Sequence, residues 1–563
     1  MSLTSRSGPE PRSRARAVLG TTVTVAAAVL LYLALVVPDS VAKHKANAWV
    51  PGAYLRLPME LIVAGAVVLA LPARWRRLAA GLFGFGVGLI AVLKITNMGF
   101  LTVLGRRFNP VLDWELFHDG YNALVETDGA TKANLAVVGA VLLSVIVLSL
   151  LTLSAVRLGT AAARHARPAR RALVALSAGW LALAISGVAL FPNAPVASDT
   201  AAALVKTTAK QVPAAVRDQR QFAEASRNDP YRNAAPADLL AGLKGKDVVI
   251  GVVESYGRSA LADPGMSSIV TPALVADQAK LAAAGFTAKS GFLTSSTYGG
   301  GSWLAHASFQ SGLWINSQPR YRQLAAGDRT TLTSTFHDAG WNTVGMEPGN
   351  TVAWPEKDFY KYDTVYDSRN LGYQGPRFGW SRMPDQYVLS QFQKNVYAKR
   401  TGPLMAEMTF TSSHEPWTPL PQTVDWDRIG DGSVYRPMAS GGVPRGSLWK
   451  DAKATQTEYA KSIAYSVDSF ISWATKYGDK NLVLVMFGDH QPISLVSGNG
   501  ASHDVPVTVI AHDDAVLSRI AGWGWQDGLK PGPDAPVWRM DEFRDRFFTA
   551  FGRSNTVALG PAH

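Results

Sequence analysis

The sequence predicts a protein in two main parts, five N-terminal transmembrane α-helices and then an extracytoplasmic α/β domain with a mostly parallel sheet. Three observations predict this. Of the 563 residues, 47% are hydrophobic and only 17% are charged, whereas about 25% of residues are charged in a soluble domain. Residues 1–200 hold 19 basic and 9 acidic residues and so carry most of the formal net charge of +12. Short β-branched runs begin only at Asp247.

Five apolar runs predict a membrane domain over residues 1–192. Each approaches the roughly 20 residues that a helix needs to cross the hydrocarbon core. A buried core helix would explain one such run, but five of them favour membrane spans. The second run is the shortest and contains Glu60. The runs are Ala17–Val37, Leu57–Leu71, Leu78–Ile95, Leu135–Val156 and Ala172–Phe191.

Basic residues gather in the segments that these spans place on one side of the membrane. Cytoplasmic loops carry the excess of Lys and Arg, so we expect a cytoplasmic N-terminus in the cell membrane. Five crossings then deliver everything after Phe191 to the outside. The basic segments are Arg6–Arg16, Arg74–Arg77 and Arg157–Arg171.

Residues 193–244 are polar, Ala-rich and partly basic, and we interpret them as a juxtamembrane linker helix near the lipid head groups. A solvated linker helix fits them equally well. Residues 201–563 hold 36 basic and 34 acidic residues, and this balance argues against nucleic acid as a partner. The chain has no cysteine, which excludes disulfides and thiolate zinc sites.

Residues 245–563 alternate strand-like and helix-like segments, as is typical of an α/β domain with its site at the carboxyl ends of the strands. Asp247–Val253 and Asn481–Phe487 are nearly continuous apolar runs, which indicate strands buried on both faces of a sheet. The predicted helices between them are Pro272–Ala284, Leu332–Ala339 and Tyr459–Tyr477.

Ionisable residues follow both predicted strands directly. Glu254 follows the first strand, and Asp489 and His490 follow the second. Charged groups at buried strand ends are costly unless they are paired or hold a metal. Two carboxylates and an imidazole suit Mn, Mg or Zn. For either motif alone, a salt-bridged strand end is the simpler explanation.

A Gly-rich turn precedes Ser302 and a helix-like pattern within Thr297–Gly312. Glycines before a helix start let the backbone approach an anion, and a hydroxyl there is placed for metal-assisted attack. Serine is also a favoured N-cap. Competing hydroxyls are Thr294, Ser295, Ser296 and Thr297.

The order strand–Glu, Gly-rich turn–hydroxyl–helix, Ser-His, then strand–Gly-Asp-His resembles the alkaline phosphatase/sulfatase superfamily. With five N-terminal helices, the chain looks most like its membrane-anchored lipoteichoic-acid-synthase-type phosphoglycerol transferases. The resemblance implies a sulfatase-like domain over residues 245–563. It also implies one divalent metal ion, Mn foremost with Mg or Zn as alternatives, on Glu254, Ser302, Asp489 and His490. Ser302 would be the nucleophile where the family has Thr.

The resemblance also assigns substrate contacts. His414, in TSSHEPW after the apolar run Leu404–Phe410, matches a His that contacts the substrate phosphate or the leaving group. Trp354 resembles the tryptophan of the head-group pocket. The family follows that tryptophan with Asn-Arg, whereas Glu356 stands at the Arg position here. Lys357 or Arg382 would then supply the cation, unless each is an ordinary surface charge.

A second metal is a further expectation from the resemblance. His503 lies where phosphoethanolamine transferases of the superfamily carry a second metal-site His, although a surface position explains His503 as well.

The predicted function is metal-dependent transfer of a phosphoglycerol-like group from a membrane lipid to a cell-envelope glycan or polymer. A phosphodiesterase or sulfatase of the same fold is the alternative, as is a non-enzymatic binding domain. The residues after Ser302 lack the Pro and Arg of formylglycine sulfatases.

Overall fold

The computed structural model describes two compact units of the chain. The first unit consists of residues 1–102 and 106–215, and the second unit consists of residues 103–105 and 216–563. The described residues are 11–38, 54–191, 194–380 and 382–553.

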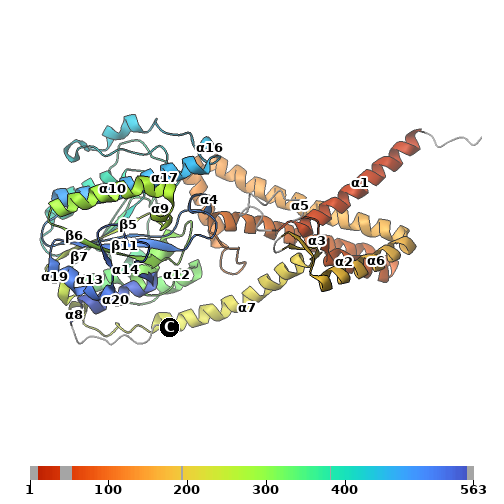
Figure 1. The fold of residues 1–563 in the computed structure, drawn as a ribbon, viewed down its shortest axis with the longest axis horizontal. Coiled ribbons are helices and arrows are strands. Elements are labelled where there is room, and N and C mark those ends of the chain that lie inside the picture. Colours follow the sequence, from red (N-terminus) through yellow and green to blue (C-terminus); the bar gives the residue numbers. More distant parts are fainter. Residues whose placement is uncertain (1–10, 39–53, 192–193, 381, 554–563) are drawn as a thin grey trace, which may run out of the picture. The chain divides into compact units, whose positions relative to one another are not determined.

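Apolar helices form the N-terminal unit (Figure 1). Four of its described helices are long and apolar enough to cross a bilayer. The second predicted span instead holds α2, whose 12 residues rise about 18 Å, less than the roughly 30 Å of a hydrocarbon core. Five spans therefore remain a prediction. The helices are α1 (Pro11–Val36), α2 (Met59–Ala70), α3 (Ala73–Val103), α4 (Glu115–Asp128), α5 (Ala130–Arg164) and α6 (Ala166–Ser186).

Short strands connect the ends of these helices. β1 pairs with β4 in parallel, and β2 pairs with β3 in antiparallel. The long helix α7 (Thr200–Arg227) follows, inside the stretch predicted as a linker. The strands are β1 (Leu57–Pro58), β2 (Ala189–Phe191), β3 (Ala194–Pro195) and β4 (Ala197–Ser198).

Within the described residues, the second unit contains a nine-stranded sheet of order β12-β6-β11-β10-β5-β9-β7-β8, with β13 also paired to β6. The strands from β10 to β8 run parallel, and β11 is antiparallel to both of its neighbours. This confirms the mostly parallel sheet. The strands are β5 (Asp247–Val253), β6 (Thr287–Thr294), β7 (Asn342–Glu347), β8 (Thr364–Asp367), β9 (Leu404–Phe410), β10 (Leu482–Gly488), β11 (Asp504–Ala511), β12 (Gln526–Asp527) and β13 (Val537–Arg539).

Helices cover both faces of this sheet (Figure 1). Val249 and Val253 of β5 join the core under α10 and α17, while Val248, Ile250 and Val252 join the core under α11, α13 and α20. Successive side chains of a strand point to opposite faces, so the continuous apolar run follows from burial on both sides. The main helices are α10 (Pro264–Ala283), α11 (Ser302–Ser311), α12 (Gln318–Ala325), α13 (Leu332–Asp338), α15 (Asp385–Asn395), α17 (Ala452–Tyr477), α19 (Asp514–Arg519) and α20 (Phe543–Phe551); the shorter ones are α8 (Pro236–Leu239), α9 (Ser259–Ala262), α14 (Lys357–Tyr360), α16 (Arg445–Leu448) and α18 (Ser494–Ser497).

Two helices begin earlier than the sequence predicts. The helix predicted from Pro272 begins at Pro264, because the Asp263 side chain caps it by accepting from the backbone N–H groups of Gly265 and Met266. Pro272 lies inside that helix. Likewise α17 begins at Ala452, after the N-cap Asp451. A side-chain cap satisfies donors that the first helical turn leaves unpaired.

The topology brings several strand ends to one edge. β6 is antiparallel to β11, which is antiparallel to β10, so β6 runs in the same direction as β5, β9 and β10. The segments after these four strands therefore meet at the carboxyl edge of the sheet, where open α/β folds bind their ligands.

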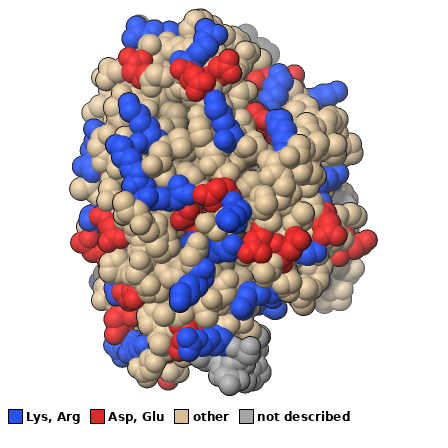
Figure 2. All heavy atoms as spheres, turned by 90° about the vertical axis from the view of Figure 1, so that its left-hand side faces the viewer, with Lys and Arg blue, Asp and Glu red and all other residues tan. Residues whose placement is uncertain are grey.

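Acidic and basic side chains intermingle on the face of the molecule in Figure 2, without a broad area of one sign among its described residues. Nucleic acid binding needs a basic face. That no nucleic acid binds remains a prediction.

Candidate metal centre and active site

Glu254, Asp489 and His490 form one buried cluster. Gly488, the last residue of β10, is in register with Val253, the last residue of β5, so the carboxylates that follow lie side by side. The three side chains are at most 4% exposed. One ligand atom from each lies within 4.8 Å of the others, a grouping found only here among the described residues.

Neighbouring groups orient these ligand atoms. Asp489 Oδ1 accepts from the backbone N–H groups of Ser255 and His490, both at 2.7 Å. His490 Nδ1 donates to the carbonyl oxygen of Gln491 at 2.8 Å. His490 Nε2 then faces Glu254 Oε1 at 3.4 Å and Asp489 Oδ2 at 3.5 Å. An imidazole whose other nitrogen donates to a carbonyl is typical of a metal ligand.

The cluster fits a divalent cation. Asp489 Oδ2 is buried and has no hydrogen-bond partner among the described residues, and a lone buried carboxylate oxygen is costly. Ligand atoms that share an ion at roughly 2.1 Å lie roughly 3–4 Å from one another, and His490 Nε2 lies at such a distance from each of the two carboxylate oxygens. An O, O and N donor set is compatible with Mn, Mg or Zn.

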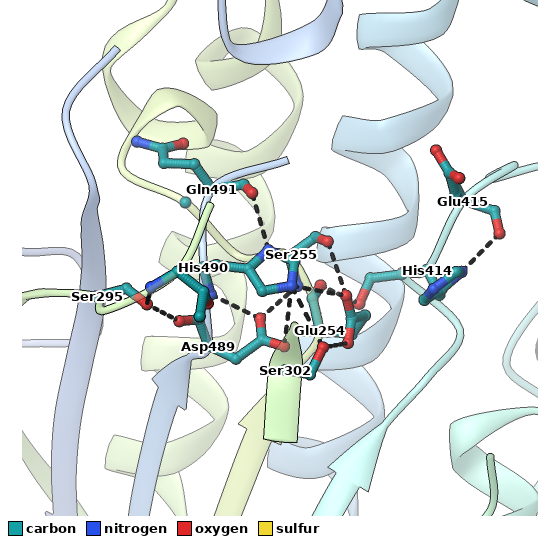
Figure 3. Close-up of polar contacts among 12 residues, drawn as sticks. Glu254, Ser255, Ser295, Ser302, His414, Glu415, Asp489, His490 and Gln491 are labelled. Carbon is teal, nitrogen blue, oxygen red and sulfur yellow. Dashed lines mark hydrogen bonds and ion pairs between the residues drawn. The ribbon is translucent and has the colours of Figure 1, made fainter. Parts of the chain in front are cut away.

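Ser302 joins this cluster from a third strand. After β6, Gly299, Gly300 and Gly301 take positive φ angles of 69°, 151° and 81°, which only glycine adopts readily. The turn ends at Ser302, the first residue of α11. Ser302 Oγ donates to Glu254 Oε2 at 2.8 Å and lies 3.3 Å from His490 Nε2 (Figure 3). A hydroxyl so close to the ligand atoms is placed to act as a nucleophile.

Electrostatic coupling moves the pKa values of Glu254 and Asp489 apart. Burial opposes ionisation of Glu254, but the charges of His490 and His414 and the Ser302 hydrogen bond lower its pKa to about 2. Burial and the negative charge of Glu254 raise the pKa of Asp489 to about 7. The two carboxylates thus repel each other when both are ionised, and a bound cation would offset their charge.

His414 follows β9 at the same edge. In Figure 3, Glu254 lies between the rings of His490 and His414. His414 Nδ1 donates to the carbonyl oxygen of Glu415 at 2.7 Å. The ring stacks on Trp380 with centroids 4.1 Å apart and 21° between planes. These two contacts fix the orientation of the imidazole ring, and neither of them uses Nε2 as a hydrogen-bonding atom.

The other predicted site residues lie outside the cluster. Trp354 packs against Tyr360 and Tyr362, and its Nε1 donates to Tyr321 Oη at 3.4 Å. Lys357 forms a surface ion pair with Asp358 at 3.1 Å.

Arg382 lies half-buried just before α15. His503 is exposed, packs on Tyr298 at 5.2 Å, and is not a member of the three-residue cluster. Substrate binding by Trp354, Lys357 and Arg382, and a second metal at His503, remain predictions.

The structure adds residues that sequence reasoning missed. Ser255 has a φ of 59°, and its hydroxyl donates to Glu254 Oε1 at 2.9 Å. His306 Nδ1 lies 3.6 Å from Glu407 Oε1. The spacing of His306, one helical turn after Ser302, was a signal for the same helix face. The strained backbone of Ser255 and the stacking of Trp380 leave no such trace in the sequence.

The buried ligand group and the helix-start hydroxyl, at the carboxyl edge of a mostly parallel sheet, are features of a metal-dependent α/β enzyme. Residues 246–507 match the family model described as Sulfatase. This part of the chain is accordingly a sulfatase-superfamily domain. No curated protein matches the chain.

Solved structures similar to the chain include the lipoteichoic acid synthase LtaP from Listeria monocytogenes, at 16% identity and a TM-score of 0.35, covering 55% of this chain and 72% of that one. The C-terminal periplasmic domain of EptC from Escherichia coli is similar at 13% identity and a TM-score of 0.38, covering 55% and 82%. A phosphonate monoester hydrolase from Silicibacter pomeroyi is similar at 10% identity and a TM-score of 0.32, covering 54% and 73%.

Proposed function

We propose that the protein is a membrane-anchored, metal-dependent phosphotransferase that moves a phosphoglycerol-like group from a lipid to an envelope glycan or polymer. The position of Ser302 Oγ, 2.8 Å from Glu254 and 3.3 Å from His490 Nε2, carries this proposal. This position places the hydroxyl of Ser302 next to a buried carboxylate and an imidazole that could bind the same ion.

Each residue of the site has its own role in the proposed reaction. Glu254, Asp489 and His490 would hold the divalent ion with Ser302, and a bound ion would supply positive charge that favours loss of the Ser302 hydroxyl proton and neutralises phosphate oxygens. Ser302 Oγ attacks the phosphorus in line, forming a P–O bond while the bond to the lipid alcohol breaks. His414 donates a proton to the departing alcohol oxygen. In the second step His414 accepts the proton of an acceptor hydroxyl, whose oxygen forms a new P–O bond while the bond between phosphorus and Ser302 Oγ breaks.

Contacts within the helical unit support the predicted orientation. Arg157 Nε, late in α5, donates to Thr24 Oγ1 of α1 at 3.0 Å. Lys94 of α3, a helix that packs antiparallel to α5, donates to the Ala34 carbonyl near the end of α1 at 3.0 Å. These two contacts mean that α1 begins at the end of the unit where α5 finishes. Leu57 pairs with Ala197, so α2 begins at the opposite end, beside the chain that enters α7. Arg74–Arg77 follow α2 at the Arg157 end. With that basic end in the cytoplasm, the chain after α6 emerges outside the cell.

Mass spectrometry of the purified full chain, incubated with Mn²⁺ and phosphatidylglycerol in detergent, tests this proposal. We expect a phosphoglycerol adduct on the peptide that contains Ser302, and none in the Ser302→Ala variant. Release of diacylglycerol and glycerol phosphate without any adduct, even after rapid acid quenching, would favour hydrolysis by a phosphodiesterase. An adduct on another hydroxyl, such as Thr297, would overturn the assignment of the nucleophile.

A further inference from the structure

An apolar groove runs along α2 and α3 in the helical unit. It consists of two adjoining cavities of about 390 and 400 Å³ that share Glu60, Phe83 and Ala202. Ligand sites typically occupy roughly 300–1,000 Å³. The lining comes from α1, α2, α3 and the first turns of α7, and it is apolar apart from Glu60 and Lys206. An apolar channel between membrane helices suits an acyl chain.

Glu60 places a charged group where the two cavities adjoin. The residue lies in the first turn of α2, and its Oε1 accepts from the backbone N–H of Ala202 at 2.9 Å. Its Oε2 is buried and has no hydrogen-bond partner among the described residues. The positive charge of Arg56, just before β1, also acts on Glu60, but it leaves Oε2 without a hydrogen bond, and a buried oxygen of this kind favours a donor group. Lys206, one turn after Ala202 on α7, lines the second cavity and adds a positive charge beside the acid.

We infer that this groove binds a phospholipid with an amine head group. One acyl chain lies between α2 and α3, the ammonium group meets Glu60 Oε2, and the phosphate lies toward Lys206. One acidic and one basic side chain in an otherwise apolar groove suit a zwitterionic head group, since the carboxylate attracts the ammonium group and the lysine attracts the phosphate. This inference goes beyond the proposed transfer reaction and does not depend on it.

Photo-crosslinking with the full chain in nanodiscs tests the inference. The probes are phosphatidylethanolamine and phosphatidylglycerol that carry the same diazirine acyl chain. We expect the amine probe to label peptides of α2 and α3 about tenfold more than the glycerol probe, the effect of one charge-assisted hydrogen bond. The Glu60→Gln variant keeps the Oε1 acceptor for Ala202 and should abolish the preference. Equal labelling by both probes in the wild type, or an unchanged preference in this variant, would overturn the inference.

A matched pair of glycine variants tests the groove itself. Gly86 lines the second cavity and Gly139 lies on α5, and a Cβ added at either position meets nothing within 4 Å. Gly86→Leu should reduce labelling of α2 and α3 by both probes, whereas Gly139→Leu should leave it unchanged. Equal effects of the two variants would contradict a site along α3. Labelling requires no turnover, and the experiment is repeated with the Ser302→Ala variant. A failure to label would therefore count against lipid binding in the groove and not against the transfer reaction.

Discussion

Ser302 Oγ donates a 2.8 Å hydrogen bond to Glu254 Oε2 although 48 residues separate the two positions. Glu254 follows β5 and Ser302 follows the glycine turn after β6, so the bond connects two loops at one edge of the sheet. The same carboxylate faces His490. A change at any of these three residues should therefore affect both metal affinity and reactivity.

Replacing Ser302 by Ala should lower turnover of a lipid donor at least about 10³-fold, because no other hydroxyl contacts Glu254 Oε2 among the described hydrogen bonds. Release of diacylglycerol measures this. The Thr297→Ala variant is the matched control, since Thr297 Oγ1 is buried nearby without a hydrogen-bond partner in the described part of the chain, and it should stay within about threefold of wild type. Full turnover in Ser302→Ala would mean that another group is the nucleophile.

Replacing Asp489 by Asn should have opposite effects with and without metal. At pH 8 in excess chelator, the variant should melt about 2–4 °C higher, because it removes a buried carboxylate whose pKa of about 7 leaves it ionised beside Glu254. With Mn²⁺ the order should reverse, because only the wild type gains binding energy. Thermal melting and metal analysis of the purified protein test this, with the exposed Asp534→Asn as control. Stoichiometric metal in Asp489→Asn would contradict the ligand assignment.

Replacing His414 by Ala should lower turnover of a lipid donor by about 10²–10⁴-fold, the usual contribution of a general acid. A p-nitrophenyl phosphodiester releases p-nitrophenolate, which leaves without needing a proton. On that donor His414→Ala should therefore lower turnover by less than about tenfold. The ratio of the two rates is the measurement. Equal losses on both donors would show that His414 binds phosphate and does not protonate the leaving group.

The buried carboxyl of Glu347 should make the α/β domain less stable as the pH rises. Burial and the charge of Glu407 raise the pKa of Glu347 to about 8, above roughly 4.3 in an unfolded chain. The folded state therefore binds this proton more tightly, and stability falls as the pH rises from about 4.3 through 8.

Glu347→Gln keeps an acceptor for Thr409, which donates to the carboxylate at 3.0–3.1 Å. We expect it to flatten the fall in stability between pH 5 and pH 9 by about 1–2 kcal/mol. Thermal melts in chelator across this range test the prediction, and Glu458→Gln, at a partly buried glutamate that pairs with Lys461, is the control. Parallel pH curves for wild type and Glu347→Gln would contradict it.

The strands and the buried cluster of Glu254, Asp489 and His490 are the part that sequence reasoning predicted best. Asp247–Val253 is a strand at the predicted boundaries, and the predicted strand Asn481–Phe487 differs from β10 by one residue at each end. Burial on both faces leaves a continuous apolar run that ends where the sheet ends. Charged residues after such runs are rare enough to mark a site. This local signal sufficed to select Glu254, Asp489 and His490, which the structure brings together.

Other features needed the tertiary structure because they depend on contacts between distant segments. The strand pairing of Val253 with Gly488 sets the distance between the two carboxylates, and the Trp380 stack fixes the ring of His414. Packing places Lys357 on the surface and leaves Glu60 Oε2 at an apolar groove. The apolar helices, the strands and the residue types of the buried cluster could be predicted from the sequence alone. Register and packing decided which of these side chains meet, because neither is encoded in the periodicity of a single segment.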